Sequence, residues 1–189
     1  MRVVHRTAAK GQALVASVRE TYGVGEAGGE ECLTDWVADA DLVINATVKG
    51  QSGWRRTSDG QFLVEPYSSL APAHPAVVDG TRPADAALAR EWFLASKADV
   101  QQNVREGLEA IARMNRSAAC FDLVYSPLES RFLRDARVAG FPTLNGKWMN
   151  VGQAADAFAR KVLASELDAH GLAGDRGYDR VFEIMVRAW

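Results

Sequence analysis

Several residues that can bind a polar ligand end or closely follow apolar segments that we expect to be β-strands. They are Arg6, Thr7, Asn45, Ala46, Thr47 and Tyr125. In an open sheet of parallel strands, ligands bind outside the carboxyl ends of the strands. The guanidinium, hydroxyl and amide groups at these positions therefore indicate a small-molecule site, and their types favour a nucleotide cofactor.

Arg6 lies where a nucleotide-binding sheet would meet the adenosine ribose, just after an expected short buried strand at residues 2–4. A guanidinium there can hold a 2′-phosphate through paired hydrogen bonds, whereas a carboxylate would accept from the ribose hydroxyl of NAD. The turn contains no acidic residue, so its composition favours NADP. The alternative is a solvated arginine in a turn. Thr7 could contact the phosphate, cap the following helix, or do both.

Asn45, Ala46 and Thr47 end an apolar segment at residues 41–47, which we expect to be a strand covered on both faces. This corner should lie beside the cofactor. A buried asparagine must also satisfy four hydrogen-bonding positions. The pattern therefore leaves two roles open for Asn45, one in holding the loop and one in contacting the cofactor.

The elements that position these residues alternate between strand and helix. Residues 2–4 precede a helix with apolar Leu14, Val15 and Val18, and a glycine-rich connection at 23–32 leads to a short helix at 33–40. That connection is not a phosphate-binding loop, because it follows no strand and contains glutamates. The fold class we expect is α/β, an incomplete Rossmann-like parallel sheet with flanking helices and a long loop and helix insertion.

The insertion spans residues 48–117. Its first part, 48–82, is rich in Gly, Ser and Pro, and we expect an irregular lid without a core of its own. Two helices should follow. The first has Thr81 as its cap and Pro83 in its first turn, and the second, at 98–115, carries an apolar stripe. The stripe consists of Val100, Val104, Leu108 and Ile111.

The α/β alternation resumes at residue 118. We expect a strand ended by Pro127, a helix at 130–140 closed by Gly140, and a short strand and turn at 141–146. A long helix at 148–171 and a final helix at 178–189 should complete the chain. The long helix carries apolar residues at helical spacing, namely Val151, Ala154, Ala155, Phe158 and Val162.

The composition excludes some partners. The 189 residues are 48% hydrophobic, and 22 basic residues against 24 acidic ones give a net charge of −2. This balance offers no electrostatic footprint for nucleic acid, and no apolar run is long enough for a membrane span. Cys32 and Cys120 form no metal-binding pair, and we expect reduced thiols in a cytoplasmic protein.

Four motifs, in this order, resemble the C-terminal NADP-binding domain of the shikimate dehydrogenase family. They are Arg6-Thr7, Asn45-Ala46-Thr47, the Asp122-x-x-Tyr125-x-Pro127 block and the closing Gly146-x-x-Met149-x-x-x-Gln153-Ala154 block. The sequence departs from the family pattern at His5, Val48 and Gln51, and the segment after Val48 is much longer. The glycine-rich pyrophosphate turn and the substrate domain with its catalytic Lys and Asp are missing. We therefore expect that the sequence is truncated, either by a start assigned at an internal Met or by deletion of a domain.

The resemblance implies one Rossmann-like NADP-binding domain over residues 1–189, with 48–117 as an insertion or lid and 146–189 as C-terminal helices. It also implies NADPH-dependent reduction of 3-dehydroshikimate, or of a related hydroxylated acid, in aromatic amino acid biosynthesis. This chain would supply the cofactor half and would be inactive alone. The alternative is a truncated, non-catalytic module that binds NADP or a partner. An exposed sheet edge would favour self-association.

The resemblance implies that Tyr125 contacts the substrate or the nicotinamide and that Gln153 contacts a shikimate-like substrate. Met149 could pack on the nicotinamide through its thioether. Gln153 should face away from the apolar stripe, and an amide suits a polyol because it both donates and accepts. Each has a plainer alternative: a tyrosine under the lid, a core methionine and a solvated glutamine. Lys49, Arg55 and Arg56 lie in a polar loop where spacing places no carboxylate to tune them, so we assign them no catalytic role.

Overall fold

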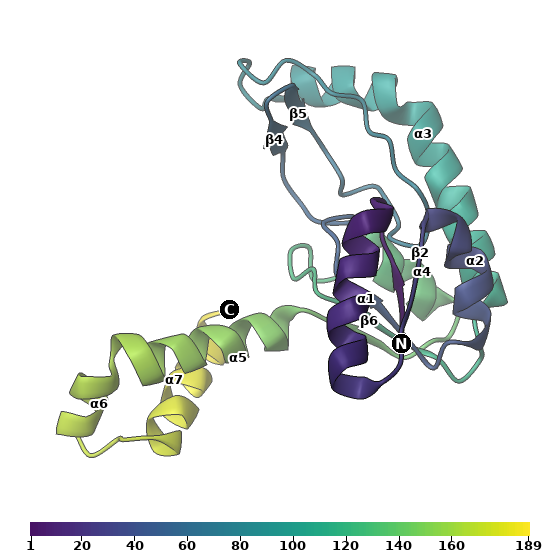
Figure 1. The fold of residues 1–189 in the computed structure, drawn as a ribbon. Helices are drawn as coiled ribbons and strands as arrows, with labels where there is room; N and C mark the ends of the chain where they lie inside the picture. The colour runs from purple at the N-terminus through teal and green to yellow at the C-terminus, as the bar shows by residue number, and fades with distance from the viewer. The chain divides into compact units, whose positions relative to one another are not determined.

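A computed structural model describes residues 1–189 and divides them into two units, Met1–Leu144 and Asn145–Trp189 (Figure 1). Parallel strands with flanking helices form the first unit, and helices form the second. The α/β class predicted from the sequence is therefore confirmed. None of the helices combines the length and the hydrophobicity that a membrane span requires.

Two parallel strand groups build the first unit. Strand β1 (Arg2–Val4) pairs with β2 (Glu26–Gly28), and β3 (Leu42–Asn45) pairs with β6 (Ala119–Asp122). Strand β7 (Thr143–Asn145) adds to the other side of β6. The glycine-rich connection therefore contains a strand that the sequence analysis missed, because glycine and glutamate are both depleted in strands.

Helical segments connect these strands. Helix α1 (Ala8–Tyr22) joins β1 to β2, and the turn η1 (Glu30–Cys32), helix α2 (Leu33–Trp36) and turn η2 (Val37–Asp39) lead from β2 to β3. Figure 1 shows the β1–β2 pair between α1 and α2. On α1 only Gly11 and Val15 are buried, while Leu14 is 52% exposed.

Strand β3 is covered on one face only, which corrects the expectation of a strand buried on both. Val43 packs against the main core, but Leu42 and Ile44 are 53% and 51% exposed. Side chains two residues apart in a strand point to the same face, so this face of β3 is bare. The main core lies on the opposite face, where Val37, Cys120 and Phe132 come together.

The insertion has a hydrophobic core of its own, contrary to expectation. Strands β4 (Arg55–Thr57) and β5 (Gly60–Phe62) form an antiparallel hairpin beside the first turns of α3 (Ala86–Arg113), as Figure 1 shows. Tyr67 and Trp92 meet edge to face in this core at 6.4 Å between ring centroids. The irregular composition of residues 48–82 concealed this core because its apolar residues follow no period.

Helix α3 is continuous where we expected two helices, since neither Gly nor Pro interrupts residues 86–106. Its cap is Asp85, which accepts from the Leu88 amide at 2.8 Å, so the expected roles of Thr81 and Pro83 were wrong. Leu108 is 45% exposed, while Asn103 is fully buried and donates to the carbonyls of Ser68, Ala71 and Pro72. A buried amide thus ties the irregular segment to the helix.

The segment after β6 contains the helix and the glycine stop that we expected, but the strand before it ends earlier than expected. Strand β6 ends at Asp122 rather than at Pro127, and the Ser126–Pro127 bond is cis. Helix α4 (Arg131–Val138) is followed by Gly140 at a φ of 92°, a conformation that glycine adopts without steric cost. The helix and its glycine stop were predicted.

The second unit breaks the long helix that we expected. Helix α5 (Lys147–Ala157) continues as the π-helical turn η3 (Phe158–Val162), followed by α6 (Ala164–Ala169) and α7 (Asp175–Ala188). The π turn shifts the helix face, so Phe158 and Val162 are 42% and 60% exposed instead of buried. Its core contains Ala155, Ala159, Val181, Leu167, Tyr178, Phe182 and Met185.

Candidate functional site

A buried carboxylate joins the carboxyl ends of β3 and β6. Asp122, at the end of β6, is fully buried. Its Oδ1 accepts from the Asn45 Nδ2 at 2.9 Å and from the Val124 amide at 2.8 Å, and its Oδ2 accepts from the Ser130 hydroxyl. Three neutral donors therefore hold one carboxylate, and they come from both strand ends and from the start of α4.

The environment of Asp122 disfavours its charge. Burial raises the pKa of the Asp122 carboxyl, and the donors from Ser130, Val124 and Asn45 oppose that shift. No cation lies among its hydrogen-bond partners. The carboxylate is thus stabilised by oriented dipoles, which makes the site sensitive to the position of each donor.

Asn45 uses all four of its hydrogen-bonding positions inside the protein. Besides Asp122, its Nδ2 reaches the Lys49 carbonyl at 3.1 Å, and its Oδ1 accepts from the Thr47 amide at 2.9 Å and hydroxyl at 2.7 Å. Of the two roles that the sequence left open, this geometry favours holding the loop. Ala46 and Thr47 are exposed at the rim of this corner.

The loop after β3 is fixed by close contacts. Gly50 has a φ of 89°, and a Cβ there would lie 2.9 Å from the Ser130 Cβ, so only glycine fits. The Gly50 amide donates to the Val64 carbonyl at 2.9 Å, and the Ser52 amide donates to the Ser126 carbonyl at 2.8 Å. The β3 and β6 loops are therefore joined to each other and to the insertion.

Lys49 has the carboxylate partner that the spacing did not reveal. Its Nζ lies 2.5 Å from Glu30 Oε1 and 2.5 Å from the Ala71 carbonyl oxygen, and both ionic side chains are largely buried. The partner comes from η1, at the end of the strand that sequence analysis missed. With two acceptors already engaged, Lys49 anchors the insertion and is poorly placed for proton transfer.

Arg6 and Thr7 lie at the carboxyl end of β1, as predicted. Both are exposed, and Arg6 makes no hydrogen bond or ion pair within the protein. Thr7 does not cap α1 with its side chain, and its amide donates to His5 Nδ1 at 2.8 Å. The first turn of α1 contains no acidic residue, so its free amides, together with Arg6, favour an anion.

Sequence analysis missed one basic residue beside this turn. Lys10 is exposed in the first turn of α1 and forms no ion pair. Its distance from Arg6 in the sequence, one helical turn, was the signal that could have identified it. A second cation here strengthens the preference of the turn for a phosphate.

The remaining site residues fall into different units. Tyr125, which follows β6, is 37% exposed. Met149 and Gln153 lie on α5 of the second unit, where Met149 is half-buried and Gln153 is exposed without a partner inside the protein. Gln153 therefore faces away from the core of its unit, as its spacing predicts.

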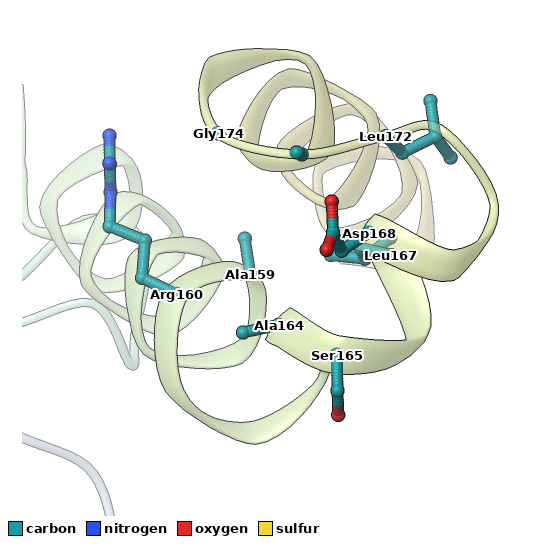
Figure 2. A pocket seen from close by; sticks show the side chains of 9 residues that line it. Ala159, Arg160, Ala164, Ser165, Leu167, Asp168, Leu172 and Gly174 are labelled. Carbon is teal, nitrogen blue, oxygen red and sulfur yellow. The ribbon is translucent and has the colours of Figure 1, made fainter.

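A cavity of about 440 Å³ in the second unit contains none of the predicted residues. Figure 2 shows it between η3, α6 and the segment before α7, with Ala159, Leu167 and Leu172 among its lining. The one cation in the lining is Arg160, which is held by Asp156 at 2.7 Å and Asp175 at 3.0 Å. An arginine already paired twice has little capacity left for a ligand.

The buried carboxylate generates a prediction on pH. The pKa of Asp122 lies above its ordinary value of 3.8 in the folded protein, so folding strengthens proton binding. The stabilisation that comes from the protonated Asp122 carboxyl is complete below the ordinary pKa of 3.8, and it is lost as the pH rises through the raised pKa of the folded protein. We expect the free energy of unfolding, relative to Asp122→Asn, to fall with rising pH across this window and then to level off.

Urea unfolding at a series of pH values measures this difference. The exposed Asp179→Asn variant is the control and should leave the pH profile of the parent protein unchanged. A difference between the parent and Asp122→Asn that grows with pH would contradict the assignment, because it requires a lowered pKa.

Comparison with known proteins supports the predicted resemblance. No family model matches the chain. A shikimate dehydrogenase (NADP(+)) of Halobacterium salinarum is 55% identical over 42 residues, which are 22% of this chain and 16% of that protein. The Haloarcula marismortui shikimate dehydrogenase (NADP(+)) is 26% identical over 160 residues, covering 85% of this chain and 40% of that enzyme.

Two solved structures align with the chain. A quinate dehydrogenase from Corynebacterium glutamicum in complex with NAD has a TM-score of 0.49 at 23% identity, covering 84% of this chain and 39% of that one. A chorismate mutase/shikimate 5-dehydrogenase fusion protein from Clostridium acetobutylicum has a TM-score of 0.47 at 23% identity, with 99% and 45% covered.

The chain thus spans less than half the length of these curated relatives. The similarity to shikimate dehydrogenases that the four motifs predict is confirmed by the sequences of these relatives.

Proposed function

We propose that this chain is the cofactor-binding part of an NADP-dependent oxidoreductase of the shikimate dehydrogenase type. The observation that carries the proposal is the unpaired Arg6 at the carboxyl end of β1, in a turn without acidic residues. The names of the relatives, which are NADP(+) enzymes, support the same cofactor. A sheet with exposed groups at its carboxyl ends is the usual site for such a ligand.

The residues of the first unit fit the adenosine end of the cofactor. Arg6 would form paired hydrogen bonds with the 2′-phosphate, and Thr7 and Lys10 would add a hydroxyl and a second charge. Ala46 and Thr47, in the loop that Asn45 holds in place, would contact the cofactor along its length. The rigid hydrogen bonding of Asn45 and Asp122 would keep this rim in one conformation.

The chemistry that a nicotinamide cofactor supplies here is hydride transfer to the carbonyl carbon of 3-dehydroshikimate or a related hydroxylated acid. In the first unit, Tyr125 would orient the hydroxyl groups of the substrate. In the second unit, Gln153 offers an amide that suits a polyol, and Met149 offers a thioether that suits the nicotinamide ring. The proposal implies a role in aromatic amino acid biosynthesis.

The acid–base pair is the part that this chain does not provide. Lys49 is the one lysine that forms an ion pair with a carboxylate, and that pair is largely buried with its donors engaged. General acid–base catalysis contributes roughly a hundred- to ten-thousand-fold to such reactions. We therefore propose that residues 1–189 bind the cofactor without catalysing turnover.

Recognition of the 2′-phosphate by Arg6 can be tested with the adenosine part of the cofactor. Calorimetric titration of the chain with adenosine 2′,5′-bisphosphate and with AMP should show tighter binding of the bisphosphate. A charged hydrogen-bonded pair contributes about 1.5–3 kcal/mol, so Arg6→Ala should weaken the bisphosphate by roughly ten- to a hundredfold and leave AMP unchanged. The exposed, unpaired Arg90→Ala is the control and should change neither. An equal loss of affinity for both nucleotides would show that Arg6 does not bind the 2′-phosphate.

A further prediction concerns turnover. The purified chain, mixed with NADP⁺ and shikimate, should give no increase in absorbance of the reduced nicotinamide, because no group is placed to take the hydroxyl proton. Chain purified from a host lacking its own shikimate dehydrogenase removes the background. Turnover on the order of 1 s⁻¹ would be an ordinary enzymatic rate and would disprove the proposal that the chain is inactive.

A further inference from the structure

The insertion encloses one charged side chain without a partner. Arg55 on β4 is partly buried, and its Nε and Nη2 atoms are shielded from solvent with no acceptor in hydrogen-bonding range. Among the side chains whose shielded polar atoms lack a partner, Arg55 is the only one that carries a charge. A guanidinium stays protonated in proteins, so it cannot become neutral when it is buried. Its enclosed edge therefore needs an anion to offset the cost of desolvation.

The register of the β4–β5 hairpin directs Arg55 toward the core of the insertion. Arg55 is opposite Phe62, and side chains directly opposite each other on antiparallel strands lie on the same face. Phe62 packs against the core that contains Tyr67 and Trp92. The next residue, Arg56, alternates to the other face of the strand and is exposed. Two adjacent arginines thus have different environments, and only Arg55 is held away from water.

The two unpartnered nitrogens form one edge of the planar guanidinium of Arg55. Nε and Nη2 direct their N–H bonds in parallel, the arrangement that binds both oxygens of one carboxylate. A hydrogen bond in such a partly dehydrated position is stronger than the same bond in water. Because the side chain retains some exposure, an anion can approach from the solvent and displace the groups that cover this edge.

The surrounding charge favours a carboxylate over a phosphate. Arg56 lies on the opposite face of β4, and the next Lys or Arg along the chain, Arg82, is engaged by Glu91 at 2.6 Å. The single charge of Arg55 is balanced by a carboxylate, whereas a phosphate group carries nearly two negative charges at neutral pH.

The backbone holds Arg55 near the loop that contains Tyr125. The Ser52 amide donates to the Ser126 carbonyl, next to Tyr125, at 2.8 Å. Arg55 follows Ser52 by three residues, so their Cα atoms are no more than about 11 Å apart. A carboxylate bound by Arg55 can therefore belong to a molecule that also reaches the Tyr125 loop.

We propose that the Nε–Nη2 edge of Arg55 is a binding site for the carboxylate of a small organic acid, separate from the phosphate site at Arg6. Two kinds of molecule supply this group. One is the hydroxylated acid of the proposed reaction, and the other is an acid that binds to the insertion independently of turnover. Only the first of these rests on the proposed function.

NMR titration of the whole chain tests the site. The reporters are the Arg55 Nε–H signal, assigned by its loss in Arg55→Lys, and the backbone amide of Phe62. Sodium benzoate and sodium shikimate should shift both signals saturably, while the uncharged methyl shikimate should shift neither. Inorganic phosphate should bind more weakly than benzoate. Tighter binding of phosphate, or no shift with either carboxylate, would overturn the proposal.

Two matched variants locate the carboxylate. Arg55→Lys keeps the charge but loses the parallel pair of donors, so it should weaken benzoate by roughly tenfold or more, as measured at the Phe62 amide. Arg56→Lys makes the same change on the exposed face of the strand and should leave the affinity for benzoate unchanged. Equal losses in the two variants would show attraction by charge alone and would contradict a site at Arg55.

A third variant distinguishes the two sources of the carboxylate. If the acid is the substrate, Tyr125→Phe should weaken shikimate and leave benzoate unchanged; if it is a separate acid, the variant should alter neither. Both results support the carboxylate site. Binding of adenosine 2′,5′-bisphosphate without any shift of Arg55 by benzoate would overturn this site alone. Binding of benzoate without any binding of the bisphosphate would contradict the proposed function alone.

Discussion

The buried carboxylate of Asp122 is the constraint on which the rest of the site depends. A carboxylate without a cation partner must be satisfied by oriented donors, and the protein supplies them from Asn45, Val124 and Ser130. These donors belong to the end of β3, the loop after β6 and the cap of α4. Their positions are therefore fixed relative to one another, and so is the rim where a cofactor would bind.

The insertion is built onto this corner. The Lys49 ion pair with Glu30 and the Gly50 amide bond to Val64 hold the β3 loop between η1 and the irregular segment. The irregular part of the insertion, residues 48–82, then packs on α3 through the insertion's own core, and Asn103 ties the two together by hydrogen bonds. A second core permits a long irregular segment to be ordered without altering the sheet beneath it.

Sequence reasoning recovered the parts of the fold that have a strong local signal. The strand at residues 2–4, the apolar strand before Asn45 and the glycine stop after α4 all follow directly from residue type and order. It failed where tertiary contacts override local preference. Strand β2 forms from Gly and Glu because β1 pairs with it, and the π turn at Phe158–Val162 leaves no mark in the spacing of apolar residues.

The candidate site shows the same division. The positions of Arg6 and Thr47 after strands could be predicted, because the carboxyl ends of parallel strands are binding sites by topology. The interaction partners that decide the roles of Lys49 and Asn45 could not be predicted. The Lys49–Glu30 pair joins residues from different loops. The hydrogen bonds of Asn45 with Asp122 and with the Lys49 carbonyl favour a role in holding the loop, a choice that the sequence left open. Such contacts depend on packing and not on spacing.

The Asn45–Asp122 hydrogen bond couples the end of β3 to the end of β6. A double-mutant cycle with Asn45→Ala, Asp122→Ala and the combined variant, measured by urea unfolding, tests this coupling. We expect a coupling free energy of about 1.5–3 kcal/mol between the two residues, as for a hydrogen bond to a charged group. Effects of the two substitutions that add to within about 0.5 kcal/mol would contradict it.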